Sequence, residues 1–295
     1  MVSVRPSLTF LTRKQRTLQS CSSFSGIGIH TGEEVTIRFC PAKEGTGIVF
    51  KRMDLPSNPV IPATIEYVQD TSRSTTIGIK DIRIHTVEHV LSAIKAYNID
   101  NLSIEISGIE PPIGNGSSDI FVNMIESGGI QEQEQTTPIV KIQDPVYWSE
   151  GDVHLVALPS DFYKISYTLH YPDFPALQGQ FHSLNINQES FKKEIAPCRT
   201  FSLYKEIAML MEQGLIKGGS LDNAIVVKDD GGILNKGELL FPTEMARHKI
   251  LDLNGDLSLI RCDFLAHIIA VRSGHTSNFA FAKCLLNYIT MENHS

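Results

Sequence analysis

The sequence lacks paired cysteines and long apolar segments. Its 295 residues include five cysteines, and none of them belongs to a C-x-x-C pair (Cys21, Cys40, Cys198, Cys262 and Cys284). An odd number of widely spaced cysteines argues against a disulfide framework and against a thiolate zinc site, and it fits a reducing compartment. No apolar run is long enough for a membrane-spanning helix, and residues 1–16 lack the features of a secretory signal. We therefore expect a soluble cytoplasmic protein with no transmembrane segment.

Basic residues are also too few to balance the acidic ones. The chain has 26 Lys and Arg against 33 Asp and Glu, a formal net charge of −7, and no basic stripe. This charge argues against nucleic acid as a partner, although a local basic pocket for one phosphorylated ligand remains compatible with it. A hydrophobic content of 42% and a charged content of 20% predict a globular protein with a proper core.

The pattern of apolar residues predicts an α+β fold. Residues alternate between polar and apolar from Glu33 to Cys40 and from Asn101 to Ser107, as in half-buried strands. Thr86 stands where a helix N-cap is expected, ahead of the helical stretch V-E-H-V-L-S-A-I-K-A-Y. Further helices are expected at about Asp119 to Ser127 and from about Thr243 onward. Because strands outnumber helices and are not regularly interleaved with them, a doubly wound fold is disfavoured.

A polar run from Gln131 to Thr137 predicts a structureless linker between two domains. We place the first domain at residues 13–134 and the second at residues 138–290. Each half has several expected strands and about two main helices, which indicates a duplicated unit.

The most informative stretch runs from Met245 to Asp256, M-A-R-H-K-I-L-D-L-N-G-D. His248 and Asp252 are four residues apart, so on a helix their side chains lie about 5–6 Å apart on one face and can converge on one cation. Asp256 continues that stripe, unless Gly255 ends the helix first. Taken alone, an H-x-x-x-D pair is more often an ordinary solvated helix face.

Two other histidines occupy positions suited to chemistry. Glu88 and His89 are adjacent at the expected helix start and point about 100° apart, so one can bind a metal while the other reaches a water on it. His89, His248 and Asp252 together would form an open three-ligand site, as in catalytic zinc centres. His275 follows the apolar strand I-I-A-V on an expected loop, a position that suits a proton donor. Each of these residues alone would be read as helix-start charge or as a surface histidine.

Taken together, these segments resemble the zinc-dependent UDP-3-O-acyl-N-acetylglucosamine deacetylases of lipid A biosynthesis. The resemblance covers the chain from Lys14 to the end of the last helix. The matching motifs are K-Q-R-T-L at Lys14, G-I-G-I-H-T-G at Gly26, T-V-E-H at Thr86, E-P-P-I-G-N-G-S-S at Glu110, R-T-F at Arg199, G-G-S-L-D-N-A-I-V at Gly218, R-H-K-I-L-D-L-N-G-D at Arg247 and S-G-H at Ser273.

The resemblance implies two similar domains, each a small, mainly antiparallel sheet with two main helices, and the helices packed between the two sheets. It implies one zinc ion per chain, held by His89, His248 and Asp252 at the domain interface. The implied reaction removes the N-acetyl group from UDP-3-O-acyl-N-acetylglucosamine and gives acetate and UDP-3-O-acyl-glucosamine, the committed step of lipid A biosynthesis in Gram-negative bacteria. Further implied roles are general base for Glu88, proton donor or charge stabiliser for His275, orientation of that histidine for Asp256, and support of the oxyanion for Thr200.

The family resemblance also assigns the segment at about residues 200–227 to an insertion that builds a hydrophobic passage for the acyl chain. Candidate substrate-binding residues are Phe201, Tyr204, Ile207 and Ile216 for this passage, and Lys249, Arg272 and Lys217 for the sugar diphosphate. Two departures from the family pattern stand out. The loop from Gly114 to Ser117 lacks the usual carboxylate, and the region near Asp70 lacks a cysteine that some members carry.

Two alternatives remain open at this point, a zinc hydrolase of another N-acyl sugar and a catalytically silent sugar-nucleotide binding protein. We expect the chain to act as a monomer.

Overall fold

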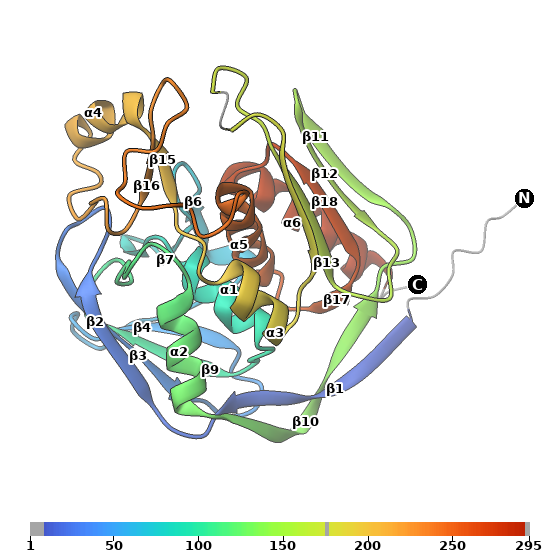
Figure 1. Cartoon of the computed structure of the whole chain (residues 1–295). Helices are drawn as coiled ribbons and strands as arrows, with labels where there is room; N and C mark the ends of the chain where they lie inside the picture. Colours follow the sequence, from blue (N-terminus) through green and yellow to red (C-terminus); the bar gives the residue numbers. More distant parts are fainter. Residues whose placement is uncertain (1–8, 175–176, 293–295) are drawn as a thin grey trace, which may run out of the picture.

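The computed structural model of the chain describes residues 9–174 and 177–292 (Figure 1). Two five-stranded sheets form its outer layers. In spatial order, the first sheet contains β2 (Ser22–Ile27), β3 (Glu34–Pro41), β9 (Leu102–Ile106), β4 (Ile48–Arg52) and β5 (Val60–Pro62). The second contains β11 (Val146–Glu150), β12 (Val153–Leu158), β18 (His267–Val271), β13 (Lys164–Leu169) and β14 (Gln180–Asn185).

The two sheets share one topology. When the strands of each sheet are numbered by their order along the chain, both read 1-2-5-3-4 across the sheet. Neighbouring strands are antiparallel in both, except for one parallel pair at the same place, β4–β9 in the first sheet and β13–β18 in the second. This equivalence supports the duplicated unit expected from the sequence.

Four main helices lie between the sheets. In each half, one helix precedes and one follows the central fifth strand: α1 (Glu88–Ala96) and α2 (Asp119–Gly128) flank β9, and α5 (Glu244–Ser258) and α6 (His275–Glu292) flank β18. Figure 1 shows α1 and α5 packed together at the centre of the molecule, with a sheet on either side. The predicted α+β fold, with two similar units and helices between two sheets, is confirmed.

A long ribbon joins the two halves and corrects the expected linker. Strand β10 (Ile130–Lys141) pairs antiparallel with β1 (Thr9–Leu18), and its far end pairs with β17 (Asp263–Leu265). The prediction of a structureless run over residues 131–137 is therefore wrong. Most of those residues are exposed, so their polar composition reflects a solvated ribbon rather than missing structure. Residues 9–12 belong to β1, and residues 1–8 lie outside the described part.

Smaller elements enter both halves at the same point, between the fourth strand and the first main helix. In the first half these include η1 (Ile65–Tyr67) and a small sheet of β6 (Val68–Asp70), β7 (Thr76–Ile79) and β8 (Ile82–Ile84). In the second half they are α3 (Gln188–Ser190), η3 (Phe191–Ile195), β15 (Phe201–Leu203), α4 (Tyr204–Glu212) and β16 (Ile225–Val227). The segment expected as an insertion at about residues 200–227 is the β15–α4–β16 unit.

The start of α1 differs from expectation. Val87, not Thr86, is the N-cap residue, and Thr86 has a φ of +56°. The Thr86 hydroxyl donates to a carboxylate oxygen of Glu110 at 3.2 Å rather than to the helix. The N-cap prediction for Thr86 is therefore wrong, because this residue turns the chain before the helix begins. Among the described residues, no helix combines the length and apolar character needed to cross a membrane.

Candidate metal centre

The site forms where α1 and α5 cross at unusually close range. Gly255 lies in α5 beside the backbone of Glu88 in α1, and a Cβ added to Gly255 would lie 2.2 Å from the Glu88 carbonyl oxygen. Next to it, the Asn254 side chain donates to the Ser92 carbonyl oxygen at 2.9 Å. Gly255 does not end the helix, since α5 continues to Ser258. The contact brings the two helices that carry the candidate ligands face to face.

Three buried side chains from these helices share one small volume. His89 comes from α1, and His248 and Asp252 come from successive turns of α5. One carboxylate oxygen of Asp252, Oδ1, lies 3.3 Å from Nε2 of His248 and 3.7 Å from Nε2 of His89. One ligand atom from each residue lies within 4.8 Å of the other two, a spacing that one metal ion can bridge. Two imidazoles and one carboxylate leave a coordination position open, as in catalytic zinc sites.

The hydrogen bond of His248 and the burial of His89 suit metal ligation. Nδ1 of His248 lies 3.0 Å from the Cys198 carbonyl oxygen. A carbonyl only accepts hydrogen bonds, so Nδ1 carries a proton, and in a neutral imidazole Nε2 then has a free lone pair toward Asp252. Burial, with the neighbouring His248, lowers the pKa of His89 to about 3, which keeps its imidazole neutral. Nδ1 of His89 is buried without a hydrogen-bond partner in the described structure.

Asp252 is held as a carboxylate. Burial would raise its pKa, but the ammonium of Lys249 and the imidazole of His248 keep that pKa well below its usual value. Lys249 donates to the other oxygen, Oδ2, at 2.8 Å. Asp252 therefore turns one oxygen toward the two histidines and the other toward a cation.

Glu88 lies beside this cluster at the first position of α1. Its Oε2 accepts a hydrogen bond from the Thr75 backbone N–H at 3.0 Å, which fixes the carboxyl group. Burial raises the pKa of Glu88 to about 7, with smaller contributions from Asp256 and Asp252 and an opposing one from His275. A cation bound at the cluster would favour the ionised form.

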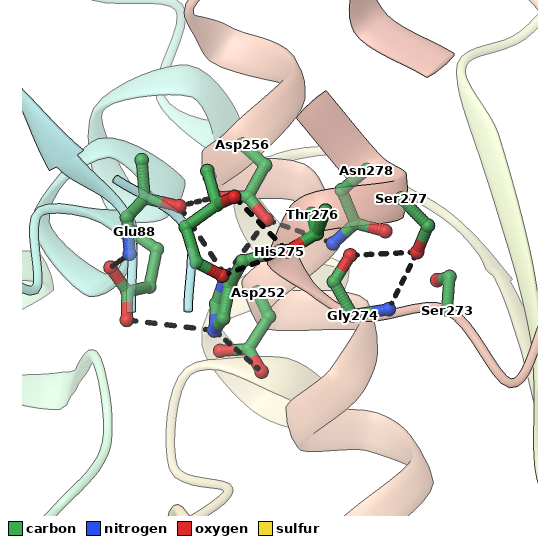
Figure 2. Close-up of polar contacts among 12 residues, drawn as sticks. Glu88, Asp252, Asp256, Ser273, Gly274, His275, Thr276, Ser277 and Asn278 are labelled. Atoms are coloured by element: carbon green, nitrogen blue, oxygen red, sulfur yellow. Dashed lines mark hydrogen bonds and ion pairs between the residues drawn. The ribbon is translucent and has the colours of Figure 1, made fainter. Parts of the chain in front are cut away.

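His275 faces Glu88 from the second half of the chain (Figure 2). It is the first residue of α6 rather than part of a loop as expected. Nδ1 lies 2.9 Å from Oδ2 of Asp256, and Nε2 lies 3.8 Å from Oε1 of Glu88. Burial lowers the pKa of His275, but the Asp256 and Glu88 carboxylates outweigh it and raise the pKa to about 9. At neutral pH this imidazole is therefore a cation.

No motif in the sequence indicated the residues that hold Asp256 in place. The Thr75 hydroxyl donates to its Oδ1 at 2.5 Å, and the Asn278 amide donates to its Oδ2 at 2.8 Å. Thr75 precedes β7 in the first half, and Asn278 belongs to α6 in the second. Their proximity arises only from the packing of the two halves.

The cluster opens into a cavity of about 540 Å³, a size typical of small-molecule sites. Glu88, His275 and all three candidate ligands line it, and Asp256 lies behind His275. The predicted residues Thr200, Phe201, Ile207, Ile216, Lys217 and Lys249 line it as well. Leu210, Met211 and Leu215 add to its apolar wall, beyond the metal cluster.

Two predicted substrate residues do not line this cavity. Tyr204 is 55% exposed on the outside of α4. Arg272, just after β18, forms an ion pair with Asp152 at 3.2 Å. The cavity instead includes His30 and Arg73, which the sequence did not indicate as binding residues.

Both of these added residues are held in place. The backbone N–H of His30 donates to the buried Glu110 carboxylate at 3.1 Å, so the glycine loop around it is fixed rather than free. Arg73 forms an ion pair with Glu206 of α4 at 3.1 Å, and both line the cavity. This pair links the two small insertions across the site.

These features define the class of protein: a duplicated α+β fold with a buried His-His-Asp centre, able to hold one metal ion, that opens into a largely apolar cavity. Comparison with known proteins identifies the family within this class. A family model described as UDP-3-O-acyl N-acetylglycosamine deacetylase matches residues 15–287. The chain belongs to this family.

Curated relatives agree with this assignment. The UDP-3-O-acyl-N-acetylglucosamine deacetylase of Chlamydia pneumoniae is 51% identical over 282 residues, which cover 95% of this chain and 100% of the relative. The protein of the same name from Chlamydia felis is 51% identical over 94% of this chain and 98% of its own length. The one from Chlamydia trachomatis serovar D is 49% identical over 96% and 98%, respectively.

Proposed function

We propose that this chain is a zinc-dependent deacetylase that hydrolyses the acetamide of UDP-3-O-acyl-N-acetylglucosamine. The products are acetate and UDP-3-O-acyl-glucosamine, and the reaction is the committed step of lipid A biosynthesis. The observation that carries the proposal is the buried His89–His248–Asp252 cluster beside Glu88 and His275, in a chain about half identical to deacetylases of this name.

The donor set fits zinc, and we propose one ion per chain. Two imidazoles and one ionised carboxylate match the ligands of mononuclear catalytic zinc, and the Cys198 carbonyl holds the proton of His248 on Nδ1 as an outer partner should. When bound by these residues, zinc would supply Lewis acidity, which would lower the pKa of water toward ~7 and polarise the acetamide carbonyl.

Glu88 has the position and pKa of a general base. Its carboxylate faces the cluster, and a pKa of about 7 lets it accept a proton from the attacking water near neutral pH. The Thr75 N–H contact holds it in that orientation.

His275 has the complementary properties of an acid. Its Nδ1–H is bound to Asp256, so Nε2–H points toward Glu88 and the cluster, where negative charge develops during attack. The leaving amine needs a proton, and both Glu88 and His275 are within reach of that role. Asp256 acts as a positioning residue, since it reaches the reaction only through His275.

Thr200 and Lys249 complete the polar wall. We propose that the Thr200 hydroxyl supports the tetrahedral oxyanion and that Lys249 contacts the substrate. The Lys249 ammonium lies 2.8 Å from Oδ2 of Asp252 and 5.5 Å from the centroid of the Phe201 ring. Because these contacts orient the ammonium, it would be in position before substrate binds.

The apolar part of the cavity suits the substrate's acyl chain. Phe201, Ile207 and Ile216 belong to the β15–α4–β16 unit and line the same cavity as the metal cluster, which supports their assignment to an acyl passage. Tyr204 and Arg272 remain predictions outside the cavity. Arg272 would reach the diphosphate only if the substrate extends past the end of β18.

We further propose that residues 13–134 and 138–290 are two domains that share the site. Glu88 and His89 belong to the first, and His248, Asp252 and His275 belong to the second. All five come from one chain, which supports a monomer as the working unit. We propose a cytoplasmic location, which suits the nucleotide-linked substrate.

Metal analysis combined with acetate release tests the proposal. Purified protein should hold one zinc ion per chain and release acetate from the UDP-linked acyl sugar, and a chelator should abolish release until zinc is restored. Asp252→Ala should lose both zinc and activity, whereas Asp161→Ala, an exposed acid on the second half, should lose neither.

Four results would contradict the proposal. Absence of stoichiometric zinc or full activity of Asp252→Ala would remove the metal centre. Equal turnover of substrates with and without an acyl chain would favour a hydrolase of another N-acyl sugar. Binding of the sugar nucleotide without acetate release would favour a silent binding protein.

A further inference from the structure

Two cysteines far from the metal centre face each other across neighbouring strands. In the β2–β3 pair, Ser22 lies opposite Phe39, and the same register places Cys21 opposite Cys40. Their Sγ atoms are 2.8 Å apart. Residues directly opposite on antiparallel strands have Cα atoms about 4.5–5.5 Å apart, inside the range of about 4.4–6.8 Å that a disulfide needs. This register is therefore compatible with a disulfide between the two sulfurs.

The pair is accessible from solvent. Cys21 is exposed and Cys40 is half-buried. Cys198 and Cys262 differ, because their thiols donate to backbone carbonyls instead of facing a second sulfur. The Cys21–Cys40 pair is thus set apart by its geometry and by the exposure of Cys21.

Two opposing influences act on the Cys40 thiol. Arg38 lies two residues before Cys40 on the same face of β3, where its positive charge favours a thiolate. Burial and the contact with Cys21 raise the pKa of Cys40 to about 12, and Glu105 adds to this effect. Cys21, the exposed member, is therefore the better attacking group.

We propose that Cys21 and Cys40 form a redox-active dithiol that closes to a disulfide by exchange with a small-molecule disulfide such as oxidised glutathione. The Cys21 thiolate attacks one glutathione sulfur, the glutathione S–S bond breaks, and one glutathione thiolate leaves. Cys40 then loses its proton and attacks the Cys21 sulfur of the mixed disulfide, and the second glutathione leaves. The protein loses two electrons and two protons, and one oxidised glutathione becomes two reduced molecules.

The disulfide would link the connection between β1 and β2 to strand β3 of the first sheet. Residues Gln19 and Ser20, between β1 and β2, already donate backbone hydrogen bonds to the end of α2 at Gly128 and Gly129. A link from the next residue to β3 shortens the free chain of the unfolded state, which stabilises the folded one. Transient disulfides of this kind are the form expected in a reducing compartment.

The test uses the full chain in buffers with a graded ratio of reduced to oxidised glutathione. After acid quenching, free thiols are alkylated and the mass is measured. The most oxidising buffer should give protein that has lost two hydrogens and that takes three alkyl groups for its five cysteines, with one cross-linked peptide joining Cys21 and Cys40. The oxidised form should unfold at a higher temperature than the reduced form.

Variants separate the two steps. Cys40→Ser should keep one glutathione on Cys21, since the resolving thiol is gone, and Cys284→Ser should cross-link as the native chain does. Both thiols remaining open to alkylation in the most oxidising buffer would overturn the proposal. So would a cross-link through another cysteine, a stable glutathione adduct on the native chain, or a lower unfolding temperature after oxidation.

Discussion

The close crossing of α1 and α5 makes Gly255→Ala a sharp test of how the site is assembled. The added Cβ would lie 2.2 Å from the Glu88 carbonyl oxygen, 2.8 Å from its carbonyl carbon and 3.0 Å from its Cα. Carbon–oxygen contacts normally lie at about 3.3–3.6 Å, so the helices must separate by about 1 Å. The obstacle is backbone, which cannot rotate away as a flexible side chain would.

Two opposing energies decide the sign of the effect. Alanine is favoured over glycine inside a helix by about 1 kcal/mol, which would stabilise α5. Overpacking of a tight interface costs about 1–3 kcal/mol. Here the added Cβ of α5 meets backbone atoms of Glu88 in α1. We expect a net loss of up to about 2 kcal/mol, together with a larger functional effect. Glu88 and His89 would shift against His248 and Asp252, and a misplacement of about 1 Å can lower turnover by ~10²-fold.

The assay combines thermal unfolding, zinc affinity and acetate release. Gly274→Ala is the matched control, because an added Cβ there meets no atom within 4 Å. Gly255→Ala should bind zinc more weakly and turn over at least ~10-fold more slowly, whereas the control should match the native chain. Native zinc affinity and turnover in Gly255→Ala would show that the separation of the helices does not govern the site.

Three further outcomes follow from the same geometry. Glu88→Gln keeps an oxygen that accepts from the Thr75 N–H but removes the basic carboxylate. We therefore expect zinc content to stay native and turnover to fall at least ~10²-fold. Unchanged turnover would show that Glu88 is not the general base. Ile207→Trp fills the apolar end of the cavity and should slow long-acyl substrates more than short ones in competition assays, while Met209→Ala, on an exposed part of the same helix, should not discriminate. Burial lowers the pKa of His182 in the folded chain below its ordinary value of about 6.5. Below about pH 6.5 the unfolded chain therefore binds a proton at His182 more readily than the folded chain does. The contribution of this histidine to the free energy of unfolding, present above that pH, is lost as the pH falls. Urea titrations at pH 7 and pH 5 measure how much the free energy of unfolding falls between the two pH values. This fall should be smaller for His182→Gln than for the native chain, by at most ~1.4 kcal/mol per pH unit. An equal fall in both would refute the role of His182 in this pH dependence.

Local spacing in the sequence predicted the parts of the site that belong to single elements. The interval of four residues between His248 and Asp252 sets their common helical face whatever surrounds it. Alternating strands and amphipathic helices likewise predicted the α+β class. These features depend on neighbours within about one turn or one strand, so they can be read from short stretches of chain.

Features that depend on exposure or on long-range contacts were not predictable in this way. The polar run of β10 looked like a linker, because a ribbon solvated on both faces has the composition of a loop. Thr86 has the residue type of an N-cap, but its positive φ and its bond to Glu110 assign it to a turn. Tyr204 and Ile207 are both apolar members of α4, and only the packing of that helix decides which one faces the cavity.

By itself, the sequence indicated the candidate ligands and the candidate base and acid, since their identities and local spacings are encoded in short motifs. Only the tertiary structure decided that His89 meets His248 and Asp252, that Thr75 holds both Glu88 and Asp256, and that the Cys198 carbonyl fixes a tautomer. The physical reason is the crossing of α1 and α5 at Gly255, which joins groups more than 100 residues apart in the chain. No local pattern encodes that distance of approach.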